Sequence, residues 1–157
     1  MSTVATVLKE FYARLAKAQE AGGMLVGWSV EIQPTEHMEG QSSKPSLNVS
    51  APTVTEKSTG SAIASPEISF VLGVSSSKTP ERAGDVALAI TQHADNIEAL
   101  KNALERNSVT GVEDVLMGGL LVEPLRIDQS ETAVKSDSFN TGVRLTMTLR
   151  AVKRGAR

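Results

Sequence analysis

The residues whose types and spacing could perform chemistry lie mainly in one turn before the longest helical pattern of the chain. The segment Ser75–Lys78 follows a predicted strand and leads into a helix that opens with Thr79-Pro80-Glu81. Free amides at a helix N-terminus favour an anion such as a phosphate. A phosphate-binding loop needs glycines that let successive amides converge, however, and this turn has none. Since a nucleophile elbow also needs a second glycine after Gly73, we interpret the segment as a serine turn with a helix cap.

The two histidines are the next candidates for chemistry. His37 lies in a polar stretch beside two glutamates, a possible weak metal site, and His93 lies within the long helix among polar neighbours. Neither has a second histidine at the spacing of metal ligands, so we predict that both are surface residues. The chain has no cysteine, which excludes thiol nucleophiles and cysteine-based metal sites. We therefore expect no metal and no cofactor.

Two pairs of carboxylates are candidates for acid–base catalysis, Glu113 with Asp114 and Asp128 with Glu131. Catalysis by such a pair requires surroundings that push the two pKa values apart. The sequence shows no partner of that kind, which favours solvated loop charges. We therefore identify no catalytic residue and expect a non-enzymatic protein. A small hydrolase or transferase that holds Asp128 or Glu113 in a concave pocket is the enzymatic alternative.

The composition is that of an ordinary globular chain. Its 157 residues, 40% of them hydrophobic and 22% charged, fit one domain spanning residues 1–157. The formal net charge of −2 gives no reason to expect a nucleic acid or an anionic membrane as partner. No apolar run has the length of a membrane span or the form of a signal peptide, so we expect a soluble protein made in the cytoplasm.

Hydrophobic periodicity outlines the elements that must position these groups. The first pattern predicts an amphipathic helix over Thr3–Glu20, with Arg14 and other charged residues largely on its solvent side and Gly22-Gly23 at its end. A strand over Met24–Ile32 carries the single tryptophan, Trp28, which we expect in the core. The later elements are, in order, a strand Ile68–Val74, the helix Pro80–Arg106, a strand Val115–Glu123 with a bulge at Gly118-Gly119, and an alternating strand Val143–Ala151.

The long helix carries one apolar face of mostly small residues. A face of this kind allows a helix to lie close on a sheet, and its members are Ala83, Ala87, Ile90, Ala94, Ile97 and Leu104. The segment Gln33–Ser65 differs, since it is rich in Ser, Thr and Pro. We interpret it as one strand around Leu47 and Val49 plus a polar extension over Lys57–Ala64. That extension either packs against a neighbouring subunit or is a solvated loop.

The order of helix, strands, central helix and strands predicts an α+β fold. We expect a single sheet, mostly antiparallel or mixed, with two helices packed on one face and a long loop extension.

This ordered pattern resembles the tail terminator proteins of long-tailed bacteriophages, also described as tail-completion or head–tail joining proteins. The resemblance covers most of the chain. It rests on the amphipathic helix Thr3–Glu20, the strand that bears Trp28, the Ser/Thr/Pro-rich extension, the long helix Pro80–Arg106 and the final strand Gly142–Leu149.

The resemblance implies a structural virion protein of the tail or neck. Such proteins form a six-membered ring that caps the tail tube, ends its polymerisation and presents a surface to the head connector. The implied partners are other copies of the chain, the tail tube protein and the connector or neck protein, with DNA passing through the ring and no membrane partner. We predict contact residues at the extension tip and on the last strand and tail, namely Lys57, Ser58, Thr59, Gly60, Arg144, Arg150 and Arg154.

Two further functions stay open at this point. Tail tube and neck subunits share much of the same pattern, and a small dimeric ligand-binding α+β domain is an alternative from a different class. A ring favours a part of the tail. A tight dimer with a closed apolar pocket favours the ligand-binding domain.

Overall fold

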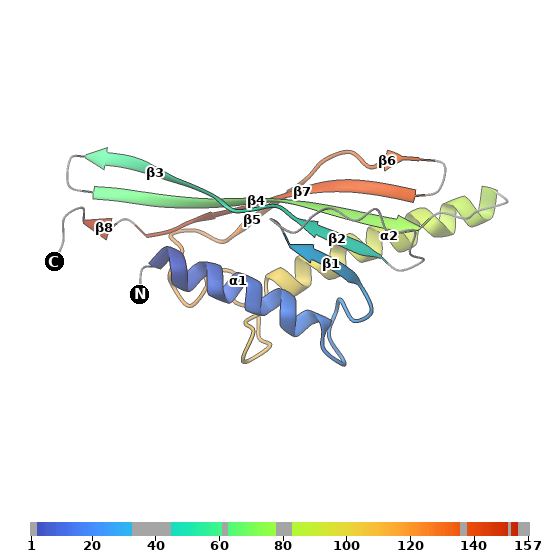
Figure 1. The fold of residues 1–157 in the computed structure, drawn as a ribbon, viewed down its shortest axis with the longest axis horizontal. Coiled ribbons are helices and arrows are strands. Elements are labelled where there is room, and N and C mark those ends of the chain that lie inside the picture. Colours follow the sequence, from blue (N-terminus) through green and yellow to red (C-terminus); the bar gives the residue numbers. More distant parts are fainter. Residues whose placement is uncertain are drawn as a thin grey trace.

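The computed structural model describes residues 3–32, 45–60, 63–77, 83–135, 138–150 and 152–153. Two helices, α1 (Thr3–Gln19) and α2 (Ala83–Leu104), lie on one face of an eight-stranded sheet (Figure 1). This arrangement confirms the predicted α+β fold. The strands are β1 (Ser29–Ile32), β2 (Ser46–Val49), β3 (Thr53–Gly60), β4 (Ile63–Ser77), β5 (Arg126–Gln129), β6 (Ala133–Val134), β7 (Ser138–Thr148) and β8 (Val152–Lys153).

The sheet is built on β4 and β7, its two longest strands, which pair antiparallel from Glu67–Thr148 to Ser77–Ser138. The strand order is β1-β2-β4-β7-β5, while β3 and β8 also pair with β4 and β6 with β7. Among the described strands, β1 and β2 alone pair in parallel. The sheet is open. Its strand path ends at β1 and at β5, and β3, which pairs with β4, forms a further outer edge.

Alternating burial explains why β4 and β7 form strands. On β4, Phe70 and Leu72 are buried toward the helices, whereas Val71 between them is exposed. On β7, Val143 and Leu145 are buried and Arg144 is exposed. Successive strand residues point to opposite faces, so one face of each strand joins the core. The predicted final strand is confirmed, but it begins earlier, at residue 138.

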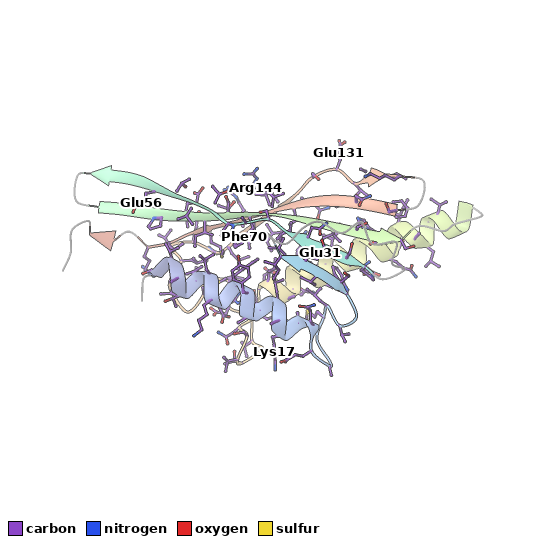
Figure 2. The ribbon with its side chains drawn as sticks, in the orientation of Figure 1. Lys17, Glu31, Glu56, Phe70, Glu131 and Arg144 are labelled. Carbon is purple, nitrogen blue, oxygen red and sulfur yellow. The ribbon has the colours of Figure 1, made fainter. Side chains whose placement is uncertain are left out.

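The helices close the core by packing on this apolar face. Helix α1 buries Val7, Phe11 and Leu15, and the Phe11 ring stacks on Phe70 with 4.1 Å between ring centroids. The position of Phe70 between the sheet and α1 is visible in Figure 2. Helix α2 contributes its second half, where Ile97, Leu100, Ala103 and Leu104 are buried.

The prediction that an apolar face of α2 packs on the sheet is wrong for the first half of the helix. Of the predicted face, Ala87 is exposed and Ile90 is 50% exposed. Burial begins one turn later, at His93. Figure 1 shows the reason, because the first half of α2 extends along the sheet past the end of α1. Among the described residues, no second helix packs beside these apolar side chains. Periodicity alone does not reveal whether another element covers a helix face.

Two predicted local features differ in the structure. The prediction of a serine turn is wrong, because Ser75–Ser77 belong to β4 and continue its pairing with β7. The strand predicted over Met24–Ile32 is shorter, because turns occupy most of residues 21–27 and β1 begins at Ser29.

Trp28 is half-buried and packs against the core, as expected. Helix α1 ends at Gln19, and the predicted end signal Gly22 lies in the turn that follows, with a left-handed φ of 83°.

The strand predicted over Val115–Glu123 is also wrong, because turns occupy most of it. Met117, Gly118 and Gly119 have φ values of 50°, 66° and 88°. Three consecutive residues in the left-handed region cannot continue an extended strand. The apolar side chains of Met117 and Leu121 still reach the core, which is why this segment resembles a strand in composition.

The extension after β1 contains more strand than predicted. Residues 33–44 lie outside the described part, but β2 and β3 are two separate strands, and β3 pairs antiparallel with β4. The threonines and valine of β3 have high strand propensity, which a Ser/Thr-rich composition hides. We call β3 together with residues 63–69 the hairpin arm. It extends beyond the N-terminal end of α1 (Figure 1).

Candidate functional site

The first predicted contact group lies on the hairpin arm. Lys57 and Ser58 pair with Ser65 and Ala64, and Gly60 pairs with Ile63, so these residues form the outer end of β3 rather than a loop. Thr59 falls at the register shift between Ser58 and Gly60. The structure therefore places the predicted contacts at a strand end, at one extremity of the molecule.

The second predicted group does not form one basic stripe. Arg144 lies on the sheet face opposite the helices, between Val71 and Asp128 on the neighbouring strands. Arg150 instead donates a hydrogen bond of 2.6 Å from Nε to the carbonyl of Gly119. It therefore holds the turn after α2 in place. Arg154 lies outside the described residues.

The open sheet face around Arg144 is mostly polar. Figure 2 shows Arg144 on the side of the sheet away from Phe70 and α1. Its direct neighbours on the adjacent strands are Val71 and Asp128, and the small residues Ser69, Gly73 and Gly142 lie nearby on the same face. An open, mostly polar sheet face suits contact with another macromolecule better than enclosure of a small substrate.

Arg14, which the periodic pattern placed on the solvent side of the first helix, is buried and joins α1 to the segment after α2. Arg14 is 1% exposed, not on the solvent side as predicted. Its guanidinium donates to the Glu10 carboxylate at 2.7 Å, to the Leu104 carbonyl at 2.7 Å and to the Asp114 carboxylate at 3.0 Å. The apolar stem of an arginine can pack in a core while its head meets acidic partners. Amphipathic periodicity does not reveal those partners, because Asp114 is 100 residues away.

The two acidic partners of Arg14 are themselves held by other groups. Ser108 donates to Glu10 from its hydroxyl at 2.6 Å and its amide at 3.0 Å. Burial raises the pKa of Glu10, but the bonds from Ser108 and Arg14 outweigh burial and hold that pKa below its ordinary 4.5. Asp114 accepts from the Gly118 amide at 2.9 Å. Asp114 is therefore a structural anchor rather than the solvated charge expected.

His93 is the second buried polar residue that the sequence pattern misplaced. It is 3% exposed, so the prediction of a surface histidine is wrong. Its Nδ1 lies 2.6 Å from the Ser76 hydroxyl and its Nε2 lies 2.8 Å from the Thr141 hydroxyl. These contacts join α2 to both β4 and β7. His37, the other histidine, lies outside the described residues.

The neighbours of His93 indicate where its proton lies. Asn96 donates from its side-chain amide to the Ser76 hydroxyl oxygen at 2.9 Å. One tautomer of neutral His93 satisfies these contacts, in which the Ser76 hydroxyl donates to Nδ1 and the protonated Nε2 donates to Thr141. Neutral His93 thus satisfies this chain of hydrogen bonds. Burial also lowers the pKa of His93.

We expect the fold to lose stability as the pH falls from 7.5 to 5.5. The unfolded His93 binds a proton near its ordinary pKa of 6.5, and the folded residue binds it only at lower pH. The unfolded state therefore takes up more protons in this window, with a slope of at most about 1.4 kcal/mol per pH unit for one site. Urea unfolding at several pH values measures the slope. A His93→Gln control should flatten it, and an equal slope in both proteins would contradict the assignment.

The other groups considered for chemistry are dispersed. Asp128 pairs with Arg126 at 3.2 Å on the exposed β5, and Glu131 is exposed nearby, as Figure 2 shows. Within the described residues, no group of three or more His, Cys, Asp or Glu side chains is placed to hold a metal ion. Neither described helix combines the length and the apolar character that crossing a membrane requires.

Two hollows mark the helix side of the molecule. One of about 220 Å³ lies at the end of α1, where Arg14, Lys17 and Arg106 contribute to its lining. The other, of about 320 Å³, lies between α2 and the strands β5, β6 and β7. Its walls include Ile90, Ile97, Val134 and Phe139, so it is mainly apolar. We call this second hollow the α2 groove.

Comparisons with known proteins identify the fold. No protein-family model matches the chain, and no curated protein matches it. A solved structure whose name states no activity has a similar fold, with a TM-score of 0.52 and 17% sequence identity over 96% of this chain and 96% of that chain. At this level of identity the likeness shows a shared fold.

Proposed function

We propose that this protein is a non-enzymatic structural subunit of a bacteriophage tail, a tail terminator. In this role copies of the chain form a ring, six-membered by resemblance to that family, which caps the tail tube and ends its polymerisation. The ring joins the tail to the head connector or neck, so the mature protein resides in the virion. The order of elements that carries this resemblance, with α1 first, α2 central and β7 near the end, supports the proposal.

The observation that carries the proposal is that the sheet has unlike open edges, among them β3 and β5. Within the described residues, β3 pairs on one side with β4, β5 pairs on one side with β7, and no strand covers the outer edge of either. Unpaired strand edges recruit other chains unless they are protected. Two different surfaces on one subunit favour head-to-tail contacts, which close into rings or continue as filaments.

The polar groups of the described chain favour a structural role over catalysis. His93 and Asp114 are fully engaged in hydrogen bonds that join elements of the fold. The exposed Arg144 on the open sheet face is the described residue that we assign to a contact with the tube protein or connector. Arg150 serves the subunit itself through its bond to Gly119.

The test of this function is the mass of the purified protein across a concentration series, followed by tail assembly with and without the protein. We expect rings, alone or on tube ends, and tubes of uncontrolled length when the protein is missing. An Arg144→Glu variant should keep its fold but bind tubes more weakly, since opposed like charges disfavour docking. Lys17→Glu, on the exposed side of α1, is the matched control.

Two outcomes would contradict the proposal. A concentration-independent tight dimer would favour the ligand-binding domain, and tubes of normal length without the protein would exclude a terminator. Rings that stack and elongate by themselves would instead indicate a tube subunit of the same group.

A further inference from the structure

The α2 groove lies where another strand would extend the sheet. One wall is a continuous stripe along three turns of α2 that includes Ile90, Ala94 and Ile97. The other wall is the helix-facing side of the outer strands, with Gln129 on β5 and Val134 on β6. Ile90 is 50% exposed and Val134 is 60% exposed. The groove therefore presents apolar side chains to solvent directly beside an unpaired strand edge.

The hairpin arm has the properties of a strand that fits this position. Its outer strand, β3, has eight residues, and within the described chain its outer edge pairs with nothing. On the helix-facing side of β3, Val54 lies opposite Ile68 and is 46% exposed. Glu56 follows on the same side, opposite Pro66. Strand addition of this kind combines backbone hydrogen bonds at the edge with pockets for alternate side chains.

The directions of the strands allow this contact between two copies in the same orientation. Strand β3 runs antiparallel to β4, β4 to β7, and β7 to β5. It follows that β3 and β5 run in opposite directions within one molecule. When β3 of one copy lies beside β5 and β6 of the next, the pair is antiparallel and the helix-facing sides match. Such a contact is head-to-tail, and it leaves the other edge of each copy free for a further copy.

The charges of the two surfaces agree with this arrangement. Glu56 is the single acidic residue of β3, and Figure 2 shows it on the arm, at the opposite end of the molecule from the first half of α2. Lys101 is the single lysine or arginine that lines the groove, where Glu98 is the single acid. When the hairpin arm lies in the α2 groove with Val54 against the apolar walls, Glu56 lies on the same side of β3 as Val54. Glu56 can then pair with Lys101.

We propose that the β3 edge of a second copy of this chain occupies the α2 groove, with Val54 against Ile90 and Val134 and with Glu56 beside Lys101. This inference rests on the ring proposed above and specifies its subunit contact. Burial of the exposed apolar side chains of both surfaces supplies the driving force, and the strand edge sets the register.

The absence of cysteine from the chain makes this contact directly testable. The double variant Val54→Cys/Ile90→Cys is treated with a short bis-maleimide, alone and on tail tube ends, and compared with Val54→Cys/Val109→Cys. Val109 is 87% exposed and does not line the groove. We expect a ladder of cross-linked multimers at least about tenfold more abundant than in the control, because docking raises the local thiol concentration.

A second variant pair tests the side-chain contact. Lys101→Glu should reduce the ladder and Glu56→Lys/Lys101→Glu should restore it, while circular dichroism confirms that each variant is folded. A double-cysteine variant that forms rings but gives no ladder above the control would overturn this contact and leave the proposed ring intact. Failure to form either rings or a ladder, even on tube ends, would overturn both proposals.

Discussion

Replacing Arg14 with methionine should lower the free energy of unfolding by about 3–5 kcal/mol, the usual cost of removing one partner from a buried charge cluster. Methionine fills much of the same space but donates no hydrogen bond. The Glu10 and Asp114 carboxylates would then lose their shared cation, and the Leu104 carbonyl would lose its donor. Urea unfolding of the two proteins at pH 7.5 measures the difference.

A control on the same helix separates this effect from a general loss of charge. Lys17 lies one turn after Arg14, pairs with Glu20 at 3.2 Å and has a side chain that is 59% exposed. Lys17→Met should therefore change stability by no more than about 1 kcal/mol. Equal losses in both variants would show that the buried cluster is not what holds α1 to the segment after α2.

Replacing Phe70 with alanine should also cost about 3–5 kcal/mol, because the variant loses a fully buried ring and leaves a cavity. Phe70 is 1% exposed. It stacks on Phe11 and meets Tyr12 edge-on, with 6.0 Å between those ring centroids. A loss of this size is a large part of the about 5–15 kcal/mol that stabilises a typical domain. Thermal and urea unfolding should both show it.

Val71→Ala is the matched control for Phe70. The residue is next in the chain but lies on the open sheet face and is 53% exposed. Its truncation should cost well under the loss at Phe70, about 0.5–1 kcal/mol from strand propensity and surface packing. If Val71→Ala were as damaging as Phe70→Ala, the open face would have to be buried in the protein as it exists in solution.

Local patterns in the sequence were sufficient for the elements with strong periodicity. The alternation of residues 143–149 identified β7, and the helical pattern ended by Gly22 identified α1. Both patterns arise from the geometry of single elements, which places every second or every third to fourth residue on one face. The same information predicted the α+β fold with both helices on one face of the sheet.

The polar interior and the edges of the sheet depended on tertiary structure. Arg14 and His93 look like surface residues in sequence, because their partners Asp114 and Thr141 are far along the chain. The apolar Leu88 and Ile90 look like core residues, but no element covers them among the described residues. Burial of a side chain depends on what packs over it, and a periodic pattern describes only the element that carries it. The sequence by itself thus determined the strongly periodic elements and the α+β layers, whereas the three-dimensional arrangement decided the remaining strands and turns and which faces are closed.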